Sequence, residues 1–470
     1  MIPLTKPSIG INEINSVSNT LKSGWITQGP KVQEFEKNFI NYTGAKYAAA
    51  VSSCTTGLQL SLISLGVQPG DLVITVSHSY IATANSIRHA MAEPVFVDVD
   101  KSNYNLDLES LKNFILDECV VKDGVIHYKK HKDLIENSPT LKHLKKLNGR
   151  ISAIIVPHQI GIPANVKGIK QFLNNYEIAI IEDAACAIGS IYDHKKYIGN
   201  PVGDAVCFSF HPRKVITTGD GGMVTSNNKK IIENIKSLRN HGMNIDPYKR
   251  KSSNKYYFDV HIDNGYNYRL TDIQAAMGVE QLARIDEIVD ERRQLGEMYK
   301  TELSTIKGLS TFENEKGNLT NWQSFPINIL TRQNSKQLVR YLFDRGVFSK
   351  RGVMNSHEEP PYIEQSWNLK NSEYLLNKTV LLPMYNGLTK KDIKLQIDGD
   401  QLNISYDKPQ EEEAWDGYIY KGLAKRSFKL GYKIAAKFDL SKIEAKMENG
   451  LLHLFIPTVA DKKAKVITIK

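Results

Sequence analysis

Residues 208–222 read FSFHPRKVITTGDGG. One lysine, Lys214, stands between a strand-like apolar run and a glycine-rich turn, and the strand-like GMVTSN begins at the end of that turn. Solvated lysines usually lie among polar residues, so we expect the amine of Lys214 to be desolvated. Desolvation lowers the pKa of an amine and makes it a usable nucleophile, as in lysines that form Schiff bases. The alternative is a lysine paired with Asp220 or another acid.

The chain before this stretch alternates strand-like and helix-like segments. The helical pattern of residues 31–43 places Val32, Phe35 and Phe39 on one face. Strands of continuous apolar character, separated by helices, indicate a parallel sheet that is covered on both faces. We therefore expect an α/β domain over residues 1–285. The predicted strands are KYAAAVS (46–52), LVITVS (72–77), PVFVDV (94–99), ISAIIV (151–156) and IAIIE (178–182).

Two further segments follow this domain. The charged helical pattern IDEIVDERRQLGEMYKTEL and the apolar run TVLLP indicate a smaller second domain over residues 286–388. Residues 389–470 alternate polar and apolar side chains with period two, and turn signals such as DGD and ENG interrupt them. We expect an all-β module there.

Composition and charge favour a soluble protein of the cytoplasm. The chain has 470 residues, a net charge of +10 and four cysteines, whose spacing fits neither a disulfide framework nor a C-x-x-C motif. No signal peptide is visible, and no apolar run approaches the ~18–20 residues that cross a bilayer. We predict no metal site and no membrane segment.

Basic residues gather between residues 118 and 150. Such a cluster can attract nucleic acid, but no aromatic side chains interleave with the lysines as base-stacking platforms would. We therefore favour a solvated insertion with a charged face and consider nucleic acid an unlikely partner. The cluster comprises Lys129, Lys130, Lys132, Lys142, Lys145, Lys146 and Arg150.

Polar residues follow several predicted strands, where ligands bind in open α/β sheets. SSCTTG (52–57) joins a strand to a helix, and its hydroxyls and backbone N–H groups suit either a phosphate or a plain helix cap. Tyr80 suits stacking on a flat ring, or is a half-buried tyrosine. Asp183 ends an apolar strand, where it pairs with a protonated ring nitrogen or caps the next helix.

Together with Lys214, these segments describe a ligand with a phosphate, a flat aromatic ring, a pyridinium nitrogen and an aldehyde. Pyridoxal 5′-phosphate (PLP) has all four. A dinucleotide is the main rival for such a sheet, but no G-x-G-x-x-G lies between a strand and a helix, and TGDGG precedes a strand. We therefore predict a PLP enzyme.

Residues 1 to about 388 resemble the DegT-type nucleotide-sugar aminotransferases, PLP enzymes of fold type I (the aspartate-aminotransferase fold). The resemblance implies a large domain with a mixed, mainly parallel sheet and a smaller α+β domain. The match to FSFHPRKVITTGDGGMV is highly specific. The other matching stretches are SGWITQGPKVQEFEKNF, SSCTTG, SHSYIATAN, IIEDAACAIGS, LRNHG, GYNYRLTDIQAAMGVEQL and LLPM.

The resemblance also implies cofactor roles. Lys214 would form the internal aldimine and later shuttle a proton between the substrate α-carbon and the cofactor. Asp183 would keep the pyridine nitrogen protonated, and Tyr80 would stack on the ring. Asn267 would reach the phosphate of the neighbouring subunit's cofactor, so a homodimer with shared sites is implied. Within one subunit the phosphate would be bound by Thr55, Thr56 and Ser209.

Substrate roles follow from the same resemblance. The family moves an amino group from a donor, usually glutamate, to a keto group on a nucleotide-linked deoxysugar, and the products feed polysaccharide, lipopolysaccharide or antibiotic pathways. Trp25, in SGWITQGP, is a candidate substrate-binding residue. Arg351 and His357 lie in SKRGVMNSHEEPPY (349–362), which matches a family loop near the sugar nucleotide, and they are candidates for the nucleotide phosphates.

The chain departs from the family at one cofactor position. After EDAA the family usually has His or Gln near the ring hydroxyl of the cofactor, whereas this chain has Cys186. Some relatives replace the lysine with histidine and act as dehydratases, and Lys214 argues against that branch. The basic insertion near residues 118–150 is also longer than the family pattern.

Residues 389–470 resemble the α-crystallin domain of small heat-shock proteins. The A-x-x-x-N-G-x-L pattern over residues 445–452 carries this resemblance. Ile467-x-Ile469 resembles the tail that docks into a neighbouring domain in that family, which implies self-association.

LLPMYNGLTKKDI fits both the end of the aminotransferase and the entry of the α-crystallin domain. We predict a fusion in which each partner has lost an end, so that the α-crystallin-like module is truncated. The alternative function is a chaperone-like or assembly protein that uses this module and keeps the aminotransferase part as scaffold. The complete set of cofactor residues favours the enzyme.

Overall fold

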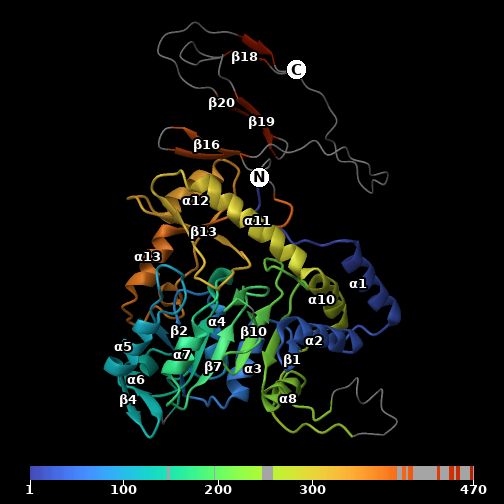
Figure 1. The fold of residues 1–470 in the computed structure, drawn as a ribbon, viewed down its shortest axis with the longest axis vertical. Helices are drawn as coiled ribbons and strands as arrows, with labels where there is room; N and C mark the ends of the chain where they lie inside the picture. Colours follow the sequence, from blue (N-terminus) through green and yellow to red (C-terminus); the bar gives the residue numbers. More distant parts are fainter. Residues whose placement is uncertain are drawn as a thin grey trace. The chain divides into compact units, whose positions relative to one another are not determined.

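The computed structural model describes residues 1–144, 149–194, 196–245 and 258–388, and beyond them the backbone of six short strands between residues 394 and 468. The chain divides into two compact units, residues 1–407 and 408–470. Figure 1 colours the chain from its blue N-terminus to its red C-terminus. Within the described ranges, none of the helices has the length and apolar character that a membrane span requires.

A nine-stranded sheet forms the centre of the first unit. β10, β7, β6, β2 and β3 run parallel to one another, and β11 is antiparallel to both β10 and β1. The sheet is therefore mixed and mainly parallel, as predicted, and β1 points the same way as β10. In spatial order its main strands are β1 (Tyr47–Val51), β11 (Gly222–Ser226), β10 (Ala205–Ser209), β7 (Ala179–Asp183), β6 (Arg150–Pro157), β2 (Leu72–Val76) and β3 (Glu93–Val97).

Helices cover both faces of this sheet (Figure 1). α3, α4 and α8 pack on one face, and α2, α5, α7 and α10 pack on the other. Because both faces are covered, β2 and β3 are buried along their whole length, which explains their continuous apolar character. The helices are α2 (Pro30–Thr43), α3 (Cys54–Ser64), α4 (Ala82–His89), α5 (Leu108–Glu118), α7 (Val166–Phe172), α8 (Lys229–Leu238) and α10 (Asp272–Ala283).

The basic insertion contributes an antiparallel hairpin that pairs with the start of the interior strand β6. β4 (Cys119–Lys122) pairs with β5 (Val125–Tyr128), β5 pairs with β6, and the short α6 (His131–Glu136) follows. The described lysines of the insertion are exposed, as expected for a solvated face, whereas Lys145 and Lys146 lie outside the described residues. The exposed lysines are Lys129, Lys130, Lys132 and Lys142.

Residues 285–388 build a second, four-stranded sheet on the long helix α11. Phe325, Ile327 and Val380 of this sheet share one hydrophobic cluster with Ile74 of the large sheet, so the two sheets are joined by a common core. The predicted boundary after residue 285 coincides with the start of α11 and stays a prediction. The elements are α11 (Ile285–Leu303), β12 (Leu309–Thr311), β13 (Phe325–Ile329), α12 (Ser335–Phe343), β14 (Lys350–Arg351), α13 (Lys370–Lys378) and β15 (Thr379–Leu382).

The chain beyond residue 388 is described only as paired strands. β16 pairs with β17, β19 pairs with β20, and β21, which contains Ile467, pairs with β18. The predicted turns DGD and ENG begin with Asp398 and Glu448, the last residues of β16 and β19, and their other residues lie outside the described residues. Ile469 lies outside the described residues. The strands are β16 (Lys394–Asp398), β17 (Gln401–Ser405), β18 (Gly431–Lys433), β19 (Glu444–Glu448), β20 (Leu451–Phe455) and β21 (Val466–Thr468).

Candidate active site

One edge of the large sheet collects most of the predicted site residues. The carboxyl ends of β1, β10, β7 and β2 meet there because these strands point the same way. Residues 52–57 follow β1, Ser209 ends β10, Asp183 ends β7, and Tyr80 follows β2. β11 runs the opposite way and starts at this edge with Gly222, so the TGDGG turn also lies here.

Lys214 lies in a turn after β10, and its side chain is half-buried. Its Nζ lies 3.1 Å from the Sγ of Cys186. Burial alone would lower the pKa of the Lys214 ammonium, but the neighbouring Cys186, Cys54 and Asp183 outweigh burial and raise its pKa above the ordinary value. The prediction of a lowered pKa is therefore wrong for the cofactor-free chain, because these neighbours favour the charged form. Within the described ranges, Asp220 forms no salt bridge with this lysine.

The carboxylate of Asp183 is buried at the end of β7. The hydroxyl of Thr83 donates to its Oδ2 at 2.7 Å, and the backbone N–H of Ala185 donates to its Oδ1 at 3.1 Å. No helix follows Asp183 directly, so the alternative of a helix cap does not apply. Among the described residues, no lysine or arginine forms a salt bridge with this carboxylate, which leaves it able to pair with a cationic ring nitrogen. Sequence reasoning missed Thr83, whose bond to Asp183 spans 100 residues.

The N-terminus of α3 presents backbone N–H groups at the same edge. The backbone N–H of Thr56 donates to Ser53 Oγ at 3.1 Å, and the Thr56 hydroxyl donates to the Ser53 carbonyl at 2.8 Å, so the helix cap uses both groups. Thr55 is half-exposed and forms no side-chain hydrogen bond among the described residues. A Cβ at Gly222 would lie 2.5 Å from the carbonyl carbon of Ser53, so only glycine lets β11 start this close to the helix. A helix N-terminus of this kind attracts anions.

Ser209 and Tyr80 leave their functional groups accessible. Ser209 is half-buried, and its Oγ accepts the N–H of His211 at a long 3.4 Å. Tyr80 is 57% exposed, so it is not a half-buried core tyrosine and its ring is open to a ligand.

Two residues from the segment before β13 brace the turns that carry Cys186 and Lys214. The Nδ2 of Asn321 donates to the Cys186 carbonyl at 2.9 Å, and the Nε2 of Gln323 donates to the Arg213 carbonyl at 2.6 Å. These bonds join residues 135 and 110 positions apart in sequence. Sequence reasoning missed both residues because no local pattern relates such distant segments.

His357 lies against the segment that follows β2. Its backbone N–H donates to Ser77 Oγ at 3.0 Å, and its Nδ1 lies 2.6 Å from the same oxygen. The adjacent His78 is fully buried, with its Nδ1 2.8 Å from Asn355 Oδ1. Burial lowers the pKa of His78 to about 4 and also lowers the pKa of His357. Both imidazoles are therefore neutral near pH 7.

The other predicted site residues have partners of their own. Arg351 donates through Nε to Ser335 Oγ of α12 at 3.3 Å, and Trp25 donates through Nε1 to the Gln28 carbonyl at 3.2 Å. Asn267 is exposed, which leaves its amide open to a second subunit. In the part of the chain that the structure describes, none of these three residues forms a hydrogen bond with Lys214.

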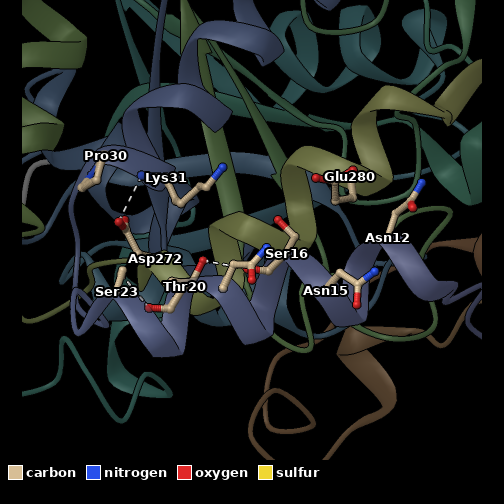
Figure 2. A pocket seen from close by; sticks show the side chains of 10 residues that line it. Asn12, Asn15, Ser16, Thr20, Ser23, Pro30, Lys31, Asp272 and Glu280 are labelled. Carbon is tan, nitrogen blue, oxygen red and sulfur yellow. Dashed lines mark hydrogen bonds between the residues drawn. The ribbon is translucent and has the colours of Figure 1, made fainter.

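A polar pocket of about 470 Å³ opens between α1 (Ile11–Ser23), the start of α2 and α10 (Figure 2). The carboxylate of Asp272 accepts the backbone N–H groups of Gly29 at 2.7 Å and of Lys31 and Val32 at 3.0 Å, which ties α2 to α10. None of the predicted site residues lines this pocket. Its lining residues are Asn12, Asn15, Ser16, Asn19, Thr20, Ser23, Pro30, Lys31, Asp272 and Glu280.

Comparison with known families agrees with both resemblances. The DegT/DnrJ/EryC1/StrS aminotransferase family matches residues 7–126 and 137–398, and the Hsp20/alpha crystallin family matches residues 379–470. The two matches overlap over residues 379–398, which contain the LLPMYNGLTKKDI stretch that fits both families. The chain thus carries an Hsp20/alpha crystallin segment after its aminotransferase part.

Individual relatives span nearly the same part of the chain. An uncharacterized protein of Methanocaldococcus jannaschii is 36% identical over 400 residues, which cover 83% of this chain and 95% of the relative. Spore coat polysaccharide biosynthesis protein SpsC of Bacillus subtilis is 31% identical over 405 residues, covering 83% and 94%. The crystal structure of the aminotransferase TlmJ from Streptoalloteichus hindustanus superposes with a TM-score of 0.69 at 28% identity, covering 83% of this chain and 95% of TlmJ. In sequence and in fold, the chain belongs to the DegT/DnrJ/EryC1/StrS aminotransferase family.

Proposed function

We propose that this chain is a PLP-dependent aminotransferase that moves an amino group from glutamate to a keto group on a nucleotide-linked deoxysugar. The observation that carries the proposal is the meeting of the Lys214 amine, the Asp183 carboxylate and the N-terminus of α3 at one edge of the sheet. Membership of the aminotransferase family supports the reaction type.

The chemistry of these groups fits PLP. Lys214 would hold the cofactor covalently through Nζ, the Asp183 carboxylate would pair with the protonated ring nitrogen, and the exposed ring of Tyr80 would stack on the pyridine. Bound PLP supplies the electron sink for charge that develops at the substrate α-carbon. The phosphate would be bound by Thr55, Thr56 and Ser209 together with the N–H groups of α3; the free hydroxyl of Thr55 suits this role better than the Thr56 hydroxyl, which the helix cap engages.

Lys214 is placed to carry the proton of the reaction on Nζ. Its raised pKa means that the amine is protonated in the cofactor-free chain, so it must give up a proton before it attacks an aldehyde. The Sγ of Cys186, at 3.1 Å, is within hydrogen-bond distance to share that proton. This thiol stands at the position where the family usually has an imidazole or amide near the ring hydroxyl of the cofactor.

The substrates and the assembly are inferred from family membership and side-chain placement. SpsC is named for polysaccharide biosynthesis, which fits an aminated sugar nucleotide as product. His357, beside the end of β2, is better placed for the substrate than Arg351, which bonds to α12, and Trp25 remains a candidate. The exposed Asn267 supports a homodimer in which each subunit completes the other's phosphate site. The four free cysteines fit the cytoplasm.

A screen of keto-sugar nucleotides with L-glutamate as donor tests this function. The chain loaded with PLP is expected to absorb visible light and to release 2-oxoglutarate in equal amount to an aminated sugar nucleotide. A colourless chain that takes up no added PLP would exclude the enzyme. A coloured chain that releases no 2-oxoglutarate with any keto sugar would exclude glutamate and this substrate class.

A second candidate function rests on the Hsp20/alpha crystallin match over residues 379–470. In this reading the module holds unfolding clients or assembles copies of the chain, in part through Ile467 and Ile469. Full-length chain would then suppress the light scattering of a heated client such as citrate synthase. No suppression at molar excess over the client rejects the second function and leaves the first untouched.

A further inference from the structure

The amine of Lys214 and the thiol of Cys186 are in direct contact, with Nζ 3.1 Å from Sγ. The two residues follow different strands, β10 and β7, and only the fold brings them together. All four cysteines are free, and in the part of the chain that the structure describes the Cys186 sulfur forms no hydrogen bond with another thiol. An amine is therefore the nucleophile that this sulfur meets.

One short segment of the second domain holds both residues. Asn321 Nδ2 donates to the Cys186 carbonyl at 2.9 Å. Gln323 Nε2 donates at 2.6 Å to the carbonyl of Arg213, the residue before Lys214, and the backbone N–H of Gln323 donates to Asn321 Oδ1 at 2.8 Å. Because the backbones of both turns are tied to the same segment, the sulfur and the amine are held together in advance of any reaction.

Cys186 is also the most accessible thiol of the chain. It is half-buried, whereas Cys54, Cys119 and Cys207 are buried, and burial raises the pKa of all three. Peroxides oxidise the thiolate form of a cysteine, and an adjacent cation favours that form. The ammonium of Lys214 is such a cation, so we expect hydrogen peroxide to oxidise Cys186 before the other three thiols.

We propose that hydrogen peroxide cross-links Cys186 to Lys214 in the cofactor-free chain, through a sulfenamide bond between Sγ and Nζ. The thiolate attacks one peroxide oxygen and the O–O bond breaks, so the sulfur is oxidised to a sulfenic acid and the peroxide is reduced. The hydroxide that leaves takes a proton from the Lys214 ammonium and becomes water. The neutral amine then attacks the sulfur, the S–N bond forms, and the S–O bond breaks to release a second water that carries one amine proton.

The cross-link occupies the amine that holds PLP in the proposed function, so the oxidised chain cannot load the cofactor. Dithiothreitol reverses it, because the dithiol is oxidised to a cyclic disulfide while the thiol of Cys186 and the amine of Lys214 are restored. The effect on loading rests on the proposed function. The cross-link itself rests only on the contact between the two side chains.

Mass spectrometry of the oxidised chain tests the cross-link. Cofactor-free full-length chain is treated with a small excess of hydrogen peroxide, blocked with iodoacetamide and digested without reductant. The expected product joins the peptides that contain Cys186 and Lys214, weighs two hydrogen atoms less than their sum, and disappears after dithiothreitol. In the same samples, most of the visible absorbance that appears on adding PLP is expected to be lost after peroxide and to return after dithiothreitol.

Three variants separate the two partners. Cys186→Ser is expected to give no cross-link and the same PLP uptake before and after peroxide. Lys214→Arg keeps a cation beside the thiol but lacks a nucleophilic amine, so Cys186 is expected to proceed to the sulfinic acid. Cys119→Ser removes a buried thiol of β4 and is the matched control, which should keep the cross-link.

Other products in the unsubstituted chain overturn the inference. These are Cys186 recovered as a sulfinic acid or in a disulfide, with no peptide joined to Lys214, and a cross-link that persists in Cys186→Ser. The proposed function fails separately: a chain that takes up no PLP even before peroxide, yet forms the cross-link, retains this inference and loses the aminotransferase.

Discussion

The reactive amine of Lys214 has an environment that differs from that of a lysine buried among apolar side chains. The thiol of Cys186 contacts Nζ, and the charge of Asp183 also raises the pKa of Lys214, so the ammonium form is favoured. Thr83 holds the Asp183 carboxylate in turn. At the scale of single residues, the site therefore contains two contacts: the Lys214 amine with the Cys186 thiol, and the Asp183 carboxylate with the Thr83 hydroxyl.

The hydroxyl of Thr83 is a positioning group for Asp183. We expect Thr83→Val to lower kcat/KM about 10- to 100-fold, because a hydrogen bond to a charged group contributes roughly 1.5–3 kcal/mol. Thr83→Ser keeps the donor and is expected to stay within about threefold of the unsubstituted chain. Steady-state kinetics at saturating PLP measures both variants, and equal activity of the two would contradict the role of the hydroxyl.

Cys186 is the thiol that reagents should reach first. It is half-buried, and its sulfur lies next to a cation, whereas Cys54, Cys119 and Cys207 are buried and burial raises their pKa. In the cofactor-free chain, iodoacetamide is expected to alkylate Cys186 before the other three cysteines. Saturating PLP is expected to slow that reaction.

Peptide mass spectrometry with and without PLP gives both rates. Cys186→Ser is the control and should leave the chain almost unlabelled over the same time. Equal labelling of all four cysteines, or no protection by PLP, would count against the arrangement around Lys214.

At the scale of elements, one reversed strand and one loop complete the site. β11 lies between β1 and β10 and is antiparallel to both. Its first residue is Gly222, which has no side chain and can therefore approach the N-terminus of α3. The loop after β14 returns to the end of β2, where Asn355 and His357 bond to His78 and Ser77. This loop therefore links the second sheet to the edge where we propose that the ligands bind.

The His78 contact makes this link sensitive to acid. The imidazole is buried and its pKa falls from 6.5 to about 4, so between these values the unfolded chain binds a proton that the folded chain does not. Stability is therefore lost as pH falls from about 6.5 to 4, by roughly 3 kcal/mol for this residue. His78→Gln is expected to flatten the fall of the urea midpoint over that range.

His89→Gln serves as the control for this prediction, because His89 is exposed at the end of α4. It should keep the acid dependence of the unsubstituted chain. An identical slope for all three chains would show that His78 is not the group that titrates.

Local patterns predicted the strands, and the polar residues after them located the edge of the sheet. They could not predict the partners supplied by distant segments. Thr83, Asn321 and Gln323 each act on a residue at least 100 positions away. For the same reason the pKa of Lys214 was predicted with the wrong sign: its apolar neighbours in sequence are visible, but Cys54 and Cys186 reach it only through the fold.

At the scale of the whole molecule, the chain joins two families through a shared stretch. The aminotransferase match ends at residue 398 and the Hsp20/alpha crystallin match begins at residue 379. The loss of an end from each partner stays a prediction. The proposed homodimer is the other property of the whole molecule, because it places Asn267 of one subunit in the site of the next.

Shared sites predict complementation between inactive chains. Lys214→Ala and Asn267→Asp are each expected to lower activity strongly when alone. A mixed dimer has one intact site, formed by Lys214 of one chain and Asn267 of the other, so co-expressed chains should recover about a quarter of the unsubstituted activity if dimers form at random. Co-expression with no recovery, in a preparation that contains mixed dimers, would contradict sharing.

The central claim is that the amine of Lys214 holds the cofactor, and borohydride reduction tests it most directly. Full-length chain is incubated with PLP, reduced, digested and mapped by mass spectrometry. The account predicts loss of visible absorbance on reduction and one phosphopyridoxyl group on the peptide that contains Lys214, with none in Lys214→Ala. A label on Lys350 or on scattered surface lysines, or a chain that takes up no PLP, would contradict it.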